Sequence, residues 1–215
     1  MKTLWRILAF GTLFSLAAAG APPGAAIEGR VTLSKARPGP IVNKRYSMTA
    51  KGGTLAGGAP AAVVYLEGSF PRPASLPDKE VMQQNMAFVP GLLAVETGTR
   101  VLFPNRDTTD HSVYSSSAAK SFNLGQYGSD EKPVPAEVFD KPGLVTLRCD
   151  IHEHMRAQIL VLDTPYFVLT DGEGRYRLEG LPAGHYVLKA WLDDKTTLEH
   201  PVELRDGGVA TADFP

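Results

Sequence analysis

Short apolar runs, interrupted every few positions by turn-forming residues, limit the folds that this chain can adopt. Runs rich in Val, Leu, Phe and Tyr alternate with Gly, Pro, Asn and Asp, as in AAVVYLEG and HYVLKAW. Apolar and polar residues also alternate along GTRVLFPN and KPGLVTLRC, which is typical of strands that bury one face. No convincing long amphipathic helix follows the N-terminal segment. The pattern therefore predicts an all-β sandwich or barrel.

Residues 1–19 have the character of a secretory signal peptide. Lys2 and Arg6 give a positive start, an apolar run over residues 7–16 follows, and three alanines precede Gly20. The apolar run is shorter than the about 18 residues that a membrane span needs. We expect cleavage before Gly20, export to a periplasmic or secreted location, and no membrane span afterwards. Retention as an uncleaved anchor is the less favoured alternative.

The charge balance argues against a nucleic-acid binder, and the cysteine count rules out an internal disulfide. The chain has 22 Lys and Arg against 23 Asp and Glu, and loss of Lys2 and Arg6 with the signal peptide leaves a net charge of −3. Nucleic-acid binders usually carry a clear basic excess, so we expect no nucleic-acid partner. Cys149 is the one cysteine, so no internal disulfide can form. It is then a buried small hydrophobic residue, a reactive thiol or a metal ligand.

Composition divides the chain into segments. Residues 35–60 are rich in Gly, Lys and Pro and are expected to form a long loop, and residues 69–77 carry three prolines, which withhold backbone donors from a sheet. A compact block follows over residues 79–163. The remaining residues, 164–215, would form only a thin core and a marginally stable sandwich alone.

We expect strands from residues 26–68 to complete the C-terminal sandwich, so that the 79–163 block is inserted into it. The alternative is a tandem arrangement, in which residues 26–163 form one sandwich and residues 164–215 form the next.

The stretch RCDIHEHMR, residues 148–156, concentrates soft metal ligands. Cys149, His152 and Met155 offer a thiolate, an imidazole and a thioether with the spacing Cys-x2-His-x2-Met. Blue-copper sites use these ligand types, with a second histidine in the plane and the methionine as a weak axial ligand. His111 is the candidate second histidine, since it follows a polar turn at the end of a predicted strand. Two loops at one end of a sandwich would then converge on one ion.

Three stretches resemble the cupredoxin superfamily and, more narrowly, secreted proteins described as methylamine-utilisation or plastocyanin-like proteins. They are FVPGLLAVETGTRVLFPNRDTTDHSVYSSS, KSFNLGQY and KPGLVTLRCDIHEHMRAQILVLDTPYF. The C-terminal TDGEGRYRLEGLPAGHYVLKAW is similar to the transthyretin-like regulatory sandwich of carboxypeptidases. The resemblance implies a cupredoxin-like Greek-key sandwich followed by a small transthyretin-like sandwich.

The resemblance also implies a ligand set and an outer partner. Asn105, in the family's N-x-D turn, is expected to brace the ligand loops by hydrogen bonding. Plastocyanin separates its loop histidine and methionine by more residues than this chain does, and the copper domain of oxidases with the shorter spacing needs a second cysteine. A mononuclear site is therefore expected, and His154 is a further candidate that would replace one of the loop ligands. The implied copper ligands are His111, Cys149, His152 and Met155.

The function that the resemblance implies is one-electron transfer by a type-1-like copper site, with a c-type cytochrome or a periplasmic dehydrogenase as partner. We expect no catalysis, because the chain lacks the local signatures of cysteine hydrolases and has too few histidines for an added catalytic copper site. Zinc is the rival metal, since one cysteine and three histidines can form a closed tetrahedral site. Two other functions stay open: copper delivery or storage, and a β-sandwich adhesion or carbohydrate-binding module with a degenerate metal site.

Overall fold

The computed structural model describes residues 24–33 and 61–215, which form strands and turns without a helix. The prediction of an all-β chain is confirmed. The predicted signal peptide and the predicted loop over residues 35–60 lie outside the described residues. Within the described part of the chain, no helix is long and apolar enough to cross a membrane.

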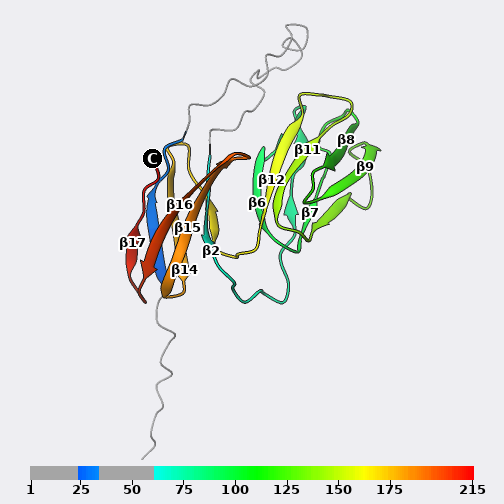
Figure 1. Cartoon of the computed structure of the whole chain (residues 1–215). Coiled ribbons are helices and arrows are strands. Elements are labelled where there is room, and N and C mark those ends of the chain that lie inside the picture. The colour runs from blue at the N-terminus through cyan, green and yellow to red at the C-terminus, as the bar shows by residue number, and fades with distance from the viewer. Residues whose placement is uncertain (1–23, 34–60) are drawn as a thin grey trace, which may run out of the picture.

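Strands from both ends of the described chain share one β-sandwich, which we call the terminal sandwich (Figure 1). One sheet has the order β14-β1-β17 and the other the order β13-β2-β15-β16. Strand β1 pairs antiparallel with β14 and parallel with β17, while β2 pairs antiparallel with β13 and β15. The strands are β1 (Ala25–Arg30), β2 (Val63–Glu67), β13 (Phe167–Leu169), β14 (Arg175–Leu181), β15 (Gly184–Asp193), β16 (Thr196–Leu204) and β17 (Val209–Thr211).

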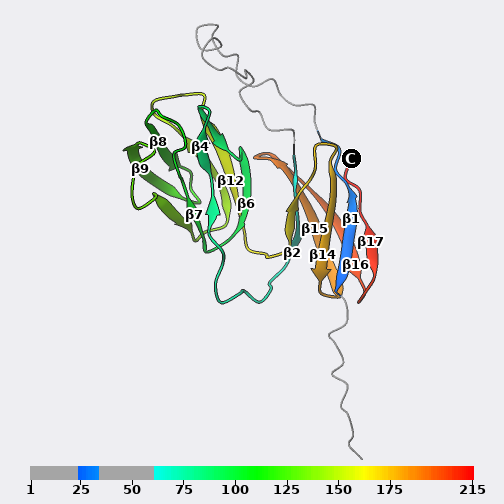
Figure 2. The ribbon, with the colours of Figure 1, turned by 180° about the vertical axis from the view of Figure 1, so that it is seen from behind.

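The strands between β2 and β13 form a second body, the middle sandwich, which lies beside the first in both views (Figures 1 and 2). A mixed sheet of order β6-β12-β11-β8-β9 shares a core with the sheet β10-β7-β3 and the hairpin β4-β5. The strands are β3 (Lys79–Glu80), β4 (Met82–Gln84), β5 (Ala87–Val89), β6 (Leu92–Glu96), β7 (Thr99–Leu102), β8 (His111–Ser116), β9 (Ser121–Tyr127), β10 (Ala136–Phe139), β11 (Gly143–Arg148) and β12 (Arg156–Leu162).

Strand β12 explains why the run ILVL is apolar at every position. Side chains along a strand point to alternate faces. Ile159 and Val161 lie in the core of the middle sandwich, whereas Leu160 and Leu162 pack with Trp191 of β15 in a separate buried cluster. We call this second cluster the junction, because it also takes in Val63 of β2 and Ala94 of β6. The run is therefore buried on both faces, and its side chains pack against both sandwiches.

Candidate metal centre

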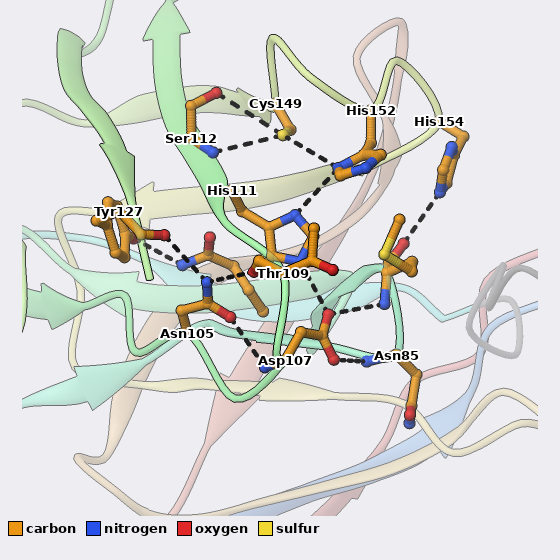
Figure 3. Close-up of polar contacts among 12 residues, drawn as sticks. Asn85, Asn105, Asp107, Thr109, His111, Ser112, Tyr127, Cys149, His152 and His154 are labelled. Carbon is orange, nitrogen blue, oxygen red and sulfur yellow. Dashed lines mark hydrogen bonds and ion pairs between the residues drawn. The ribbon is translucent and has the colours of Figure 1, made fainter. Parts of the chain in front are cut away.

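Three segments of the middle sandwich meet at one end, beyond the ends of their strands (Figure 3). The first is the turn between β7 and β8, which ends at His111; the second is the loop between β11 and β12, which begins at Cys149. The third is the Asn85-Met86 tip of the β4-β5 hairpin. Because β8 and β11 are neighbours in one sheet, their ends bring His111 and Cys149 together from positions far apart in the sequence.

His111, Cys149 and His152 form the one group of potential metal ligands found among the described residues. Their donor atoms all lie within 4.8 Å of one another. The two Nδ1 atoms of His111 and His152 are 3.1 Å apart, and Cys149 Sγ lies 4.0 Å from His152 Nδ1. Metal bonds of about 2.0–2.1 Å to nitrogen and 2.3 Å to sulfur place such donors about 3–4 Å apart. Both distances therefore suit donors to a single ion, and the third pair, His111 and Cys149, lies within 4.8 Å.

The three donors differ in exposure. His111 is fully buried and Cys149 is 3% exposed, whereas the His152 side chain is half-buried. Burial lowers the pKa of His152, and the neighbouring His111 and His154 lower it further. The neutral imidazole, which is the form that binds a metal, is thereby favoured.

Met155 and His154 belong to the same loop as Cys149 and His152 but have different surroundings. Met155 is 1% exposed and belongs to the same buried core as Cys149, and its N–H donates to the His152 carbonyl at 2.9 Å, which closes the loop. The His154 Nε2 atom lies 3.1 Å from the carbonyl oxygen of Met86, and its ring centroid is 6.0 Å from that of His152. His154 is thus not among the three converging donors, and its Nε2 atom is engaged by the hairpin tip.

Asn105 holds the turn that leads to His111. Its side-chain amide donates to the carbonyls of Thr109, at 2.9 Å, and Tyr127, at 3.1 Å, and its Oδ1 accepts the N–H of Asp107 at 2.9 Å. Asn105 is 6% exposed, so these hydrogen bonds replace those that water would otherwise make. The side chain fixes the backbone on both sides of the polar turn.

Two residues of the site escaped the sequence analysis. Ser112 donates its backbone N–H to Cys149 Sγ at 3.5 Å and has its hydroxyl 3.7 Å from the same sulfur, while that hydroxyl accepts the N–H of Asp150 at 2.8 Å. Asp107 lies 2.9 Å from the Nε2 atom of His111. Ser112 directly follows His111 in the sequence, and Asp107 precedes it by four residues. Neither spacing alone identifies a residue that supports the site.

The sequence matches no known family profile and no curated protein. Part of the chain is similar to solved copper proteins. A copper-containing nitrite reductase from Thermus scotoductus SA-01 is 22% identical with a TM-score of 0.39, over 46% of this chain and 25% of that protein, so the similarity spans a quarter of the reductase. A methionine-to-alanine variant of amicyanin in the Cu(I) form is 16% identical with a TM-score of 0.37, over 46% of this chain and 98% of amicyanin. A purple cupredoxin from Nitrosopumilus maritimus is 19% identical with a TM-score of 0.35, over 39% of this chain and 99% of that protein.

Proposed function

We propose that this chain is an exported copper protein that carries single electrons. The observation that carries the proposal is the convergence of one thiol and two imidazoles on the space between two ligand loops. One Cys and two His in a plane, with a weak axial Met, is the donor set of blue-copper electron-transfer sites. Cys149, His111 and His152 would hold the copper ion, and the thioether of the buried Met155 would be a weaker fourth ligand.

Copper is favoured over zinc by the same donor set. A structural zinc site closes its tetrahedron with a fourth strong ligand, usually Cys or His. Cys149 is the chain's single cysteine, and the Nε2 atom of His154 faces the Met86 carbonyl. The thioether of Met155 is a soft donor that suits Cu(I), whereas structural zinc sites are closed by Cys, His or carboxylate ligands. The donors at hand therefore suit copper better.

The surrounding residues support repeated electron transfer without rearrangement. Bound copper would cycle between Cu(II) and Cu(I), taking one electron from a reduced partner and passing it to an oxidised one. His111 and Cys149 sit at the ends of neighbouring strands and are buried, so packing fixes their positions in both oxidation states. Ser112 ties the two ligand loops through its contacts to Cys149 and to the Asp150 N–H.

The partner would approach at His152. This is the most exposed of the three donors, so an electron would have the shortest path to the outside through its ring. A c-type cytochrome or a periplasmic dehydrogenase is the partner that the resemblance to plastocyanin-like proteins implies. The signal-peptide pattern of residues 1–19 supports a periplasmic or secreted location, where such proteins work.

Copper loading of the protein without its first 19 residues tests the proposal. We expect one copper per chain and an intense visible thiolate-to-Cu(II) charge-transfer band, which Cys149→Ser removes. Absorption and EPR spectra report the band and the copper geometry. Stoichiometric copper without the band would instead favour delivery or storage. Failure to retain copper would contradict the proposal and favour a binding module with a degenerate site.

Substitution of the two loop histidines, one at a time, distinguishes the proposed ligand His152 from the nearby His154. His152→Ala removes one of the three converging donors, so we expect copper affinity to fall by more than the about 10–100-fold that the loss of an outer partner costs. His154→Ala is the matched change two residues away and is expected to leave one copper per chain and the spectrum in place. Competition with a chelator measures both affinities. Loss of copper from the His154 variant alone would show that the ligand set is different.

A further inference from the structure

We propose that His154 is a positioning residue that holds the 149–155 loop against the tip of the β4-β5 hairpin and thereby slows the release of copper. This inference rests on the proposed copper site and bears on whether that site retains its metal. Its basis is a contact between segments far apart in the sequence: His154 Nε2 donates to the carbonyl oxygen of Met86 at 3.1 Å.

The 149–155 loop carries three of the four proposed ligands, yet part of it is open to solvent. Ile151 is 44% exposed, so packing alone does little to hold this part of the loop. Near the start of the loop, the Asp150 N–H donates to Ser112 Oγ at 2.8 Å. Near its end lies the contact of His154 with the hairpin. His152 stands between these two contacts, so both restrict its movement.

The hairpin is a firm support for this contact. Gln83 of β4 is fully buried, its backbone N–H donates to the Pro104 carbonyl at 2.9 Å, and its own carbonyl accepts the Arg106 N–H at 2.8 Å. Phe88 of β5 is 3% exposed and belongs to the core of the middle sandwich. Both strands of the hairpin are therefore fixed close to its tip, and a loop that is bonded to the tip is fixed as well.

His154 is placed to hold the loop rather than to bind the ion. Its ring centroid is 6.0 Å from that of His152, whereas the His111 centroid is 4.9 Å from it. Figure 3 shows His154 on the side of His152 that faces away from Cys149, with its ring directed toward the hairpin tip. The contact therefore restrains the loop from outside the group of converging donors.

This restraint affects how fast copper can leave. Release requires a ligand to move away from the ion, and His152 is the most exposed of the three converging donors. Its movement displaces the neighbouring loop residues, so the contact between His154 and Met86 has to open. The net contribution of one hydrogen bond corresponds to a factor of about 2–10 in such an opening equilibrium. The contact thus favours retention of the metal, as an electron carrier needs, over its delivery.

His154→Ala and Ile151→Ala form a matched pair that tests this role. Both truncate a side chain of the 149–155 loop, but only the first removes a contact with the hairpin. We expect both variants to bind one copper per chain with the thiolate band in place, and His154→Ala to release it about 2–10-fold faster than the wild type. Decay of the band after addition of excess EDTA measures the rate. His154→Gln keeps a side-chain N–H of similar reach and is expected to restore most of the slow release.

The Met155 amide provides a readout that needs no copper. Its N–H donates to the His152 carbonyl at 2.9 Å within the loop, so its exchange with deuterated water reports the opening of the loop. In the copper-free protein we expect this amide to exchange about 2–10-fold faster in His154→Ala than in the wild type. Ile151→Ala is expected to exchange at close to the wild-type rate.

Unchanged release and exchange rates in His154→Ala would overturn the proposal, as would equal increases in the two alanine variants. A structure of the copper-loaded wild type in which His154 binds the ion or turns to solvent would also overturn it, whether or not the variants fold. If the protein takes up no copper while the Met155 amide of His154→Ala exchanges faster, the proposed function fails but the contact between loop and hairpin retains its positioning role.

Discussion

Phe139→Ala is expected to lower the free energy of unfolding of the middle sandwich by about 3–5 kcal/mol. Phe139 ends β10 with no exposed surface, and its ring packs edge-on against Phe122 of β9 with the centroids 6.1 Å apart. Removal of the ring leaves a cavity between the two sheets, because the strands on either side are tied by ladder hydrogen bonds and cannot close the gap. The free-energy cost of lost apolar burial and the cost of lost packing contacts around the cavity then add to each other.

Val138→Ala is the matched control for this substitution. Val138 is the preceding residue of the same strand, but its side chain points to the other face and is 45% exposed. We expect a change within about 0.5 kcal/mol, as for most surface substitutions. Urea titrations followed by near-ultraviolet circular dichroism give both values. Similar losses for the two variants would show that Phe139 is not in a closed core.

Gly29→Ala is expected to destabilise the terminal sandwich by about 1–3 kcal/mol or more. A Cβ atom at Gly29 would lie 1.8 Å from the carbonyl oxygen of Ala212 and 2.7 Å from its carbonyl carbon, so backbone must move to admit it. Next to this contact, the Ala212 N–H donates to the Glu28 carbonyl at 3.0 Å. The methyl group would therefore separate β1 from the C-terminal segment that pairs with it.

Gly91→Ala serves as the control, because a Cβ atom there meets nothing within 4 Å. We expect a change within about 0.5 kcal/mol. Thermal unfolding and limited proteolysis of the C-terminal strands would compare the two variants. A Gly29→Ala protein as stable and as protease-resistant as the control would contradict the close approach of β1 to Ala212, and with it the inclusion of β1 in the same sandwich as β17.

The sequence predicted the all-β class because that property is local. Alternation in GTRVLFPN and the glycines and prolines between runs act over a few residues, and the prediction is confirmed by the strands observed. The loop of candidate ligands could also be recognised in the sequence, since Cys149, His152 and Met155 are close together there. The structure brings His111 to Cys149 and His152 and leaves the Nε2 atom of His154 at the hairpin tip.

The residues that support the site were not predictable in this way. Asp107 matters because two N–H groups of Asn85 and Met86, more than 20 positions earlier in the chain, fix it against His111. Ser112 matters because its neighbour in space is Cys149. Such contacts depend on which strands pair, and strand pairing between distant segments leaves little trace in local patterns. In FPNRDTTDH the N-x-D turn includes the first aspartate, but only the fold shows that this side chain contacts His111.

The double-sided burial of β12 has a consequence for how the molecule fluctuates. A strand that contributes to two apolar clusters cannot open without exposing both, so its amide protons should be among the last to exchange with deuterated water. Strand β12 starts at Arg156, directly after the loop that carries His152 and Met155. The loop is thus anchored in a strand whose amide protons are expected to exchange slowly, and this anchoring is expected to limit thermal motion of the loop. The terminal sandwich adds to this restraint, because its Trp191 packs against Leu160 and Leu162 on the other face of β12.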